Sequence, residues 1–226
     1  PNYIPYRTTY YNKNWGFCLS YKDYLKLKKG NYKVVIKSSL KDGYLEYSDT
    51  ILEGKSKKQI LISSYLCHPQ MANHELSGPL ASMVIYDYLK KRGKNYYSYR
   101  FLVCPENIGS IAFLYKNKKN IKKKILEGYV LNFLASGRKF TYKKSRLGNS
   151  ISDKAAINVL KNNSNNLIIK DFIPEGADER QFCSPGFNLP IGVISRDDYT
   201  SFKEYHTSLD NLTKFDFNVF YDSINK

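Results

Sequence analysis

Several residue types that mark common protein classes are scarce in this sequence. Cysteine occurs four times in 226 residues, the cysteines are far apart, and none forms a CxxC pair. A chain of this size does not depend on disulfides, so reduced thiols and a cytoplasmic location are expected. No apolar run is long enough to cross a bilayer, and we expect no membrane partner. The N-terminus has neither an initiator methionine nor a signal-peptide pattern, which favours a piece of a longer protein.

Acidic residues are also scarce. The chain has 20 Asp and Glu against 36 Lys and Arg, a formal net charge of +16. Such a field attracts nucleic acids and anionic glycans. The lysines are dispersed, however, and their densest run, residues 116–124, lies where a helix is expected to end. No nucleic-acid motif accompanies this run, so we interpret it as a solvated surface and do not expect a nucleic-acid partner. Binding of an anionic polymer remains an alternative.

Short apolar runs and helical periodicity dominate the chain from residue 59 onward. Apolar runs of strand length, typical of strands buried on both faces, alternate with segments whose apolar residues have helical spacing. The expected strands are 59–66, 100–104, 129–134 and 189–194, and the expected helices are 78–92, 109–117 and 153–160. Strands that alternate with helices predict an α/β fold: a three-layer sandwich with a mostly parallel central sheet flanked by helices.

The N-terminal part of the chain has a different pattern. Residues 1–20 are aromatic and irregular, whereas residues 32–53 alternate apolar and charged side chains around a Lys41-Asp42-Gly43 turn signal. We therefore predict a small β-rich insertion or flap at 21–56. The main α/β domain would comprise residues 1–20 and 57–226.

Polar residues follow the predicted strands at their carboxyl ends. His68 follows the first strand, Glu106 follows the second, and His206 lies in the loop after the last. His74, the remaining histidine of the chain, comes shortly after His68. Ligand sites of open α/β sheets lie beyond the carboxyl ends of the strands. The sequence therefore predicts a polar site at one edge of the sheet.

Histidines and carboxylates at one edge of a sheet favour zinc, which binds imidazole nitrogen and carboxylate oxygen. His68 and His206 are the candidate ligands, and Glu75 or His74 could supply a third. Glu106 is the candidate general base, because catalytic zinc sites use a carboxylate outside the ligand set. Structural alternatives exist: His74 alone is typical of a surface histidine, and Glu106 could serve as a favourable charge at a helix start.

Long motifs in the chain are similar to those of a known family. The motif segments are residues 4–11, 15–18, 61–69, 71–79, 105–110, 175–187 and 205–211. In this order they resemble a bacterial family of aminopeptidase-like proteins of unassigned function, often encoded near polysaccharide-biosynthesis genes. That family is similar in turn to the co-catalytic zinc aminopeptidases and glutamate carboxypeptidases. The resemblance implies a zinc-exopeptidase-like fold.

The resemblance also implies roles for single residues. His68 corresponds to the first metal ligand, Glu106 to the base and His206 to the last ligand, while Asp210 would orient an imidazole from the second shell. The chain departs from the pattern at three places. His74, followed by Glu75, stands where the bridging aspartate is expected, Asn107 replaces the second residue of a Glu-Glu pair, and residues 131–136 contain no aspartate for the remaining ligand. These departures favour one zinc ion over two, and a complete loss of metal binding is the alternative.

A loop over the active site of related peptidases is similar to residues 178–181. The residues expected to contact substrate are Asp178, Glu179, Arg180, Gln181 and Asn107. Arg180 could hold a substrate carboxylate or form an ion pair with Asp178 or Glu179. The leading hypothesis is a zinc-dependent aminopeptidase-like hydrolase that cleaves an amide bond in a peptide or amino-sugar substrate. The alternative is a catalytically degenerate peptidase-fold binding module in polysaccharide biosynthesis.

Overall fold

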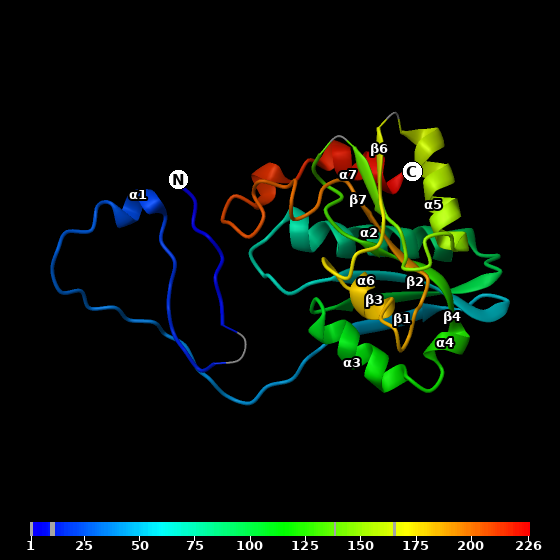
Figure 1. Cartoon of the computed structure of the whole chain (residues 1–226), viewed down its shortest axis with the longest axis horizontal. Coiled ribbons are helices and arrows are strands. Elements are labelled where there is room, and N and C mark those ends of the chain that lie inside the picture. Colours follow the sequence, from blue (N-terminus) through cyan, green and yellow to red (C-terminus); the bar gives the residue numbers. More distant parts are fainter. Residues whose placement is uncertain (1, 10–11, 138, 165) are drawn as a thin grey trace.

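A seven-stranded mixed sheet forms the centre of the molecule (Figure 1). The structure is a computed structural model that describes residues 2–9, 12–137, 139–164 and 166–226. The strands are β1 (Ser48–Leu52), β2 (Ser56–Tyr65), β3 (Tyr97–Cys104), β4 (Ile125–Leu131), β5 (Phe140–Lys143), β6 (Leu167–Lys170) and β7 (Ile191–Ser195). Their order is β1-β3-β2-β4-β7-β5-β6. The four central strands β3, β2, β4 and β7 run parallel, whereas β1 and β5 pair antiparallel with β3 and β7.

Helices cover both faces of this sheet. The helices are α1 (Tyr21–Tyr24), α2 (Asn73–Arg92), α3 (Ile108–Asn117), α4 (Ile121–Lys124), α5 (Ile151–Asn163), α6 (Glu179–Phe182) and α7 (Phe217–Ile224). Apolar side chains of α2, α5 and α7 pack on one face, and those of α3 and α6 pack on the other. The predicted three-layer α/β sandwich is confirmed. No helix among the described residues has the length and apolar character needed to cross a bilayer.

Strand β2 shows why the apolar runs predicted the sheet correctly. Leu61 belongs to the core cluster that contains Phe113 of α3, whereas Ile62 belongs to the cluster that contains Ala81 of α2. Successive side chains of a strand point to opposite faces, so a strand between two helical layers must be apolar on both. The parallel arrangement brings the carboxyl ends of β2, β3, β4 and β7 to one edge of the sheet.

The predicted β-rich secondary structure of residues 21–56 is wrong for most of this segment. Residues 25–47 form neither helix nor strand, and residues 48–52 are strand β1, paired with β3 at the edge of the main sheet. The segment 25–47 extends away from the body of the molecule (Figure 1). Although its apolar and charged residues alternate as in a strand, it pairs with no other strand among the described residues. The predicted domain limits at 1–20 include residues 1, 10 and 11, which lie outside the described part of the chain.

Helix α2 begins at Asn73, five residues before the predicted start, and this places the motif 73–75 inside its first turn. The side chain of Asp210 accepts hydrogen bonds from the backbone N–H groups of Asn73 (2.8 Å) and His74 (3.1 Å). Free N–H groups at a helix start need such partners. A carboxylate from the other end of the chain therefore starts the helix earlier than its apolar periodicity indicates.

Candidate metal centre and adjoining cavity

Three histidines from distant segments meet beyond the carboxyl ends of the central strands. His68 follows β2, His74 lies in the first turn of α2, and His206 lies in the loop after β7. One side-chain nitrogen from each lies within 4.8 Å of the others. The ring of His68 is 4.6 Å from that of His206 and 5.4 Å from that of His74, measured between centroids. The predicted meeting of His68 and His206 is thus present in the structure, and His74 joins them.

Each of these imidazoles has a buried nitrogen without a hydrogen-bond partner in the described structure. The atoms are His68 Nε2, His74 Nδ1 and His206 Nε2. His74 Nδ1 lies 3.3 Å from Glu75 Oε1, without the geometry of a hydrogen bond. Buried polar atoms are almost always paired, so three such nitrogens at one place call for an explanation. Burial lowers the pKa of His74 to about 3 and that of His206 to about 4. Both rings are therefore neutral near pH 7 and can offer a lone pair, as zinc requires.

Glu75 lies beneath this cluster and is fully buried. One of its carboxylate oxygens is 2.8 Å from His68 Nδ1, and the other accepts a hydrogen bond from the backbone N–H of Cys67. Burial alone would raise the pKa of Glu75, but its hydrogen bond with His68 and the neighbouring groups keep it below the usual value. A carboxylate bound to the second nitrogen of a ligand histidine orients the ring. This contact fits an orienting role for Glu75 better than the ligand role considered from the sequence.

Asp210 was expected to orient an imidazole, but its side chain bonds to the backbone of α2 instead. Its two oxygens accept from the N–H groups of Asn73 and His74, and none of its hydrogen bonds within the described chain goes to a histidine ring. The Asn73 side chain in turn accepts from the backbone N–H of Ala135 at 2.8 Å. Asp210 therefore positions His74 through the helix start rather than through its ring.

The N-terminal segment covers one side of the histidine cluster. Pro5 forms an antiparallel bridge with Thr207, and the N–H of Tyr6 donates to the carbonyl of His206 at 2.8 Å. The ring of Tyr6 meets those of His68 and His206 edge-on, with centroids 4.7 and 5.5 Å apart. His206 has a φ of 52°, in the left-handed region, so its backbone needs such support. Sequence reasoning missed Tyr6, although it lies in the first motif segment.

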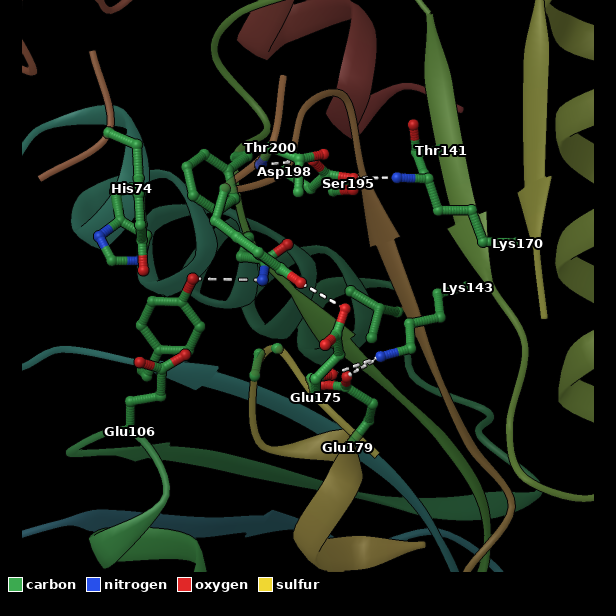
Figure 2. Close-up of a pocket in the computed structure, with 18 of the residues that line it drawn as sticks. His74, Glu106, Thr141, Lys143, Lys170, Glu175, Glu179, Ser195, Asp198 and Thr200 are labelled. Carbon is green, nitrogen blue, oxygen red and sulfur yellow. Dashed lines mark hydrogen bonds and ion pairs between the residues drawn. The ribbon is translucent and has the colours of Figure 1, made fainter. Parts of the chain in front are cut away.

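A cavity of about 170 Å³ adjoins the cluster, and both His74 and Glu106 line it (Figure 2). Glu106 lies between β3 and α3, as predicted. Burial raises the pKa of Glu106 to about 8, and the charges of Asp178, Glu75 and Glu179 act in the same direction. A carboxyl group that exchanges its proton near neutral pH is suited to general acid–base chemistry.

The predicted substrate loop at 178–181 mainly supports the start of α3. Asp178 is buried and accepts hydrogen bonds from the N–H of Asn107 and the hydroxyl of Ser110, and burial raises its pKa to about 7. Arg180 Nε and Gln181 Nε2 both donate to Asn107 Oδ1, at 2.7 and 3.2 Å. Arg180 thus contacts an amide rather than the carboxylates proposed as its partners. Of the five predicted substrate residues, Glu179 lines the cavity.

The far wall of the cavity consists of residues that sequence reasoning did not identify. Lys143 Nζ lies 2.8 Å from Glu179 Oε1, and Lys170 pairs with Asp198. The hydroxyl of Tyr199 donates to Glu175. Lys143 and Lys170 lie on the short strands β5 and β6, which the sequence pattern did not predict. Figure 2 shows Lys143 and Lys170 on the opposite side of the cavity from His74 and Glu106.

Comparison with known proteins places this geometry in a family. A family model described as a domain of unknown function, DUF4910, matches residues 4–226. A Clostridium acetobutylicum protein described as a candidate polysaccharide biosynthesis protein with an aminopeptidase-like domain is 43% identical over 209 residues, which cover 92% of this chain and 48% of that protein. A crystal structure of a candidate peptidase from Clostridium acetobutylicum has a TM-score of 0.94 at 41% identity, covering 99% of this chain and 52% of the other. The chain thus spans about half the length of these relatives.

More distant solved structures share the fold alone. A zinc aminopeptidase from Bacillus subtilis has a TM-score of 0.66 at 14% identity, over 79% of this chain and 47% of that one. A glutaminyl cyclase from Porphyromonas gingivalis has a TM-score of 0.60 at 14% identity, over 80% and 74% of the two chains. With an aminopeptidase-like α/β fold and a family model that matches nearly its whole length, the chain belongs to the DUF4910 family.

Proposed function

We propose that this chain is a single-metal hydrolase that cleaves an amide bond. His68, His74 and His206 would hold one zinc ion, and Glu106 would act as the general acid and base. The observation that carries the proposal is the convergence of three imidazoles, each of which has a buried nitrogen without a hydrogen-bond partner in the described structure. A ligand set of three histidines leaves a position open for water or substrate, as in catalytic zinc sites.

A bound zinc ion would polarise the substrate carbonyl and lower the pKa of the attacking water, so that this water loses a proton more readily. The remaining chemistry belongs to the protein. Glu106 would remove a proton from the attacking water and deliver it to the leaving amine, because its raised pKa lets it do both near neutral pH. Glu75 would hold the ring of His68 in place, and Asp210 would fix the backbone of His74.

The proposed substrate is a peptide, from which an N-terminal residue is released, or an acylated amino sugar. Zinc aminopeptidases among the structural neighbours support amide hydrolysis through their fold. The description of the Clostridium acetobutylicum relative supports a role in polysaccharide biosynthesis. The cavity beside Glu106 is small, which favours a single residue or sugar unit at the bond that is cleaved.

Zinc content is the first test. Purified, undepleted protein should retain about one zinc per chain by elemental analysis, and His74→Ala and His206→Ala should each abolish retention. Asn211→Ala, a change beside the same loop, is the matched control and should keep the metal. Glu106→Gln should keep both fold and zinc but lose turnover of aminoacyl and N-acyl amino-sugar amides. Absence of zinc from the undepleted wild-type protein would refute the proposal.

A second candidate function is a non-catalytic binding module. The features that favour it are His74 and Asn107, which occupy positions where the resembled peptidases have acidic ligands. Such a module should bind a peptide or glycan with the same affinity in the presence and absence of a chelator. The ligand affinity of such a module should also stay the same in Glu106→Gln, whereas a hydrolase with this substitution should lose turnover.

A further inference from the structure

Residues 12–47 form an extended arm that carries a high density of exposed apolar side chains. The arm leaves the body of the molecule (Figure 1), and its helical part is the four-residue α1. Fourteen of its large hydrophobic side chains are exposed, including Trp15 (70%) and Tyr44 (99%), and Ser20 is the one buried residue in this range. Soluble proteins rarely expose apolar side chains in such a concentration unless another molecule covers them.

The backbone of the arm also lacks partners. Residues 31–46 form neither helix nor strand, and they make no backbone-to-backbone hydrogen bond within the described chain. Their sequence nevertheless has the composition of a strand. Val34, Val35 and Ile36 are β-branched, and Tyr32, Val34 and Ile36 would share one face of an extended chain. Unpaired backbone groups beside such side chains are a template for a strand of another polypeptide.

The arm follows the same course in a relative. The crystal structure of the candidate peptidase from Clostridium acetobutylicum superposes on 99% of this chain with a TM-score of 0.94. The arm is about a sixth of the chain, so a score this high requires nearly the same path in both proteins. A path that is kept without hydrogen bonds from residues 31–46 to their own domain indicates an external contact. This chain covers 52% of the relative, which therefore has nearly as much further polypeptide to cover the arm.

Charge distinguishes a second copy of this chain from a different polypeptide as the occupant. Residues 25–47 carry six lysines and two acidic residues, a formal charge of +4. Two such segments paired with each other would place lysines opposite lysines, which destabilises a sheet. A strand with acidic side chains would instead pair favourably with them. The charge balance therefore favours a different, acidic polypeptide segment.

An aromatic hollow of about 550 Å³ marks the place where the arm meets the N-terminal segment. Tyr3 and Pro5 of that segment line it together with Phe17 and Tyr21 of the arm. Pro5 also lines the neighbouring hollow that contains His68. A unit that docks on the arm and fills the aromatic hollow would thus border the histidine cluster.

We propose that the arm docks a second polypeptide unit, which adds a strand beside residues 32–37 and covers the face formed by Tyr32, Val34 and Ile36. In the relatives, the half of their length that this chain does not match would supply this unit. The unit is recognised through unpaired backbone groups, an apolar face and acidic side chains opposite the lysines. The inference does not rest on the proposed hydrolase function, because no residue of the arm belongs to the histidine cluster.

Hydrogen exchange measures whether the arm is covered. The probe is the unmatched half of the Clostridium acetobutylicum relative, co-expressed with this chain. Alone, this chain should be a monomer by analytical ultracentrifugation, and the amides of residues 31–46 should exchange at nearly the rates of an unstructured peptide. In the complex they should exchange at least 100-fold more slowly. Slow exchange in this chain alone would mean that its own domain or a second copy covers the arm, and would overturn the proposal.

The intact relative keeps the test decisive if its separate half does not fold. Its segment aligned with residues 31–46 should exchange at least 100-fold more slowly than the same residues in this chain. Fast exchange in both proteins would overturn the proposal. A soluble probe that forms no complex with this chain would overturn it as well.

Two substitutions on opposite faces of the arm test which face is covered. Ile36→Asn places an amide on the face proposed to be buried and should weaken binding of the probe at least tenfold. Val35→Asn is the matched control on the other face and should change the affinity less than threefold. Both variants should leave the stability of this chain alone unchanged, because both side chains are exposed. Equal affinities in the two variants would refute the assignment of the covered face.

Discussion

The raised pKa of Glu106 makes a prediction about stability that requires no substrate. Burial and three neighbouring carboxylates raise this pKa from 4.5 to about 8. Between these two values the folded protein retains a proton that the unfolded chain has released. The stabilisation is therefore present below pH 4.5 and is lost as the pH rises through about 8. Gln at this position stays neutral, so Glu106→Gln should stabilise metal-free protein increasingly as the pH rises.

The size of the effect follows from the two pKa values. Each pKa unit corresponds to about 1.4 kcal/mol, so a rise from 4.5 to about 8 corresponds to about 5 kcal/mol. Glu106 is only half-buried, and water entering the cavity reduces the effect. We expect the variant to gain about 2–5 kcal/mol over the wild type between pH 5 and pH 8.5.

Urea unfolding of chelator-treated protein at pH 5 and pH 8.5 measures this difference directly. Glu53→Gln, whose carboxylate is exposed and pairs with Lys57, is the control and should change little between the two pH values. Added zinc should shrink the gain at pH 8.5, because a nearby cation favours the carboxylate form. If Glu106→Gln and wild type differ by the same free energy at both pH values, the reasoning about Glu106 is wrong.

Three further predictions concern residues that contact the histidine cluster or pack the helix that carries His74. Tyr6→Ala should weaken zinc binding about tenfold in a chelator competition, while Tyr6→Phe keeps the ring and the affinity; equal affinity in both would contradict a supporting role. Glu75→Gln should weaken zinc binding about 10–100-fold, because the ligand ring loses its charged partner; an unchanged zinc affinity would leave Glu75 without an orienting role. Gly78→Ala should cost about 3 kcal/mol in urea unfolding, since a Cβ there would lie 2.2 Å from the carbonyl oxygen of Leu131; a cost below about 0.5 kcal/mol would show that α2 can move away from β4.

The central sheet was predictable because its strands are buried on both faces. The apolar runs of β2, β3, β4 and β7 carry that signal within a few residues each, and the polar residues after them marked the edge where His68, Glu106 and His206 lie. The strands β5 and β6 were missed because each has four residues, too few for a pattern. The far wall of the cavity was missed with them.

The sequence pattern was also misleading where the secondary structure depends on pairing with another strand. Residues 32–47 alternate like a strand, but a strand needs a neighbour, and the described chain offers none there. The roles of Glu75 and Asp210 depended on which atoms they reach in space. Sequence could indicate that both belong to the site. It could not show that Glu75 holds the ring of His68 or that Asp210 holds the first turn of α2.

The bond between Asp210 and His74 joins residues 136 positions apart in the chain. The centre it supports consequently cannot exist in a partly folded intermediate, since closing so long a loop requires most of the sheet to be in place. An ion that binds there would join segments from opposite ends of the chain, so it would bind the folded protein far better than the unfolded one. The free energy of unfolding should then rise with the concentration of free zinc.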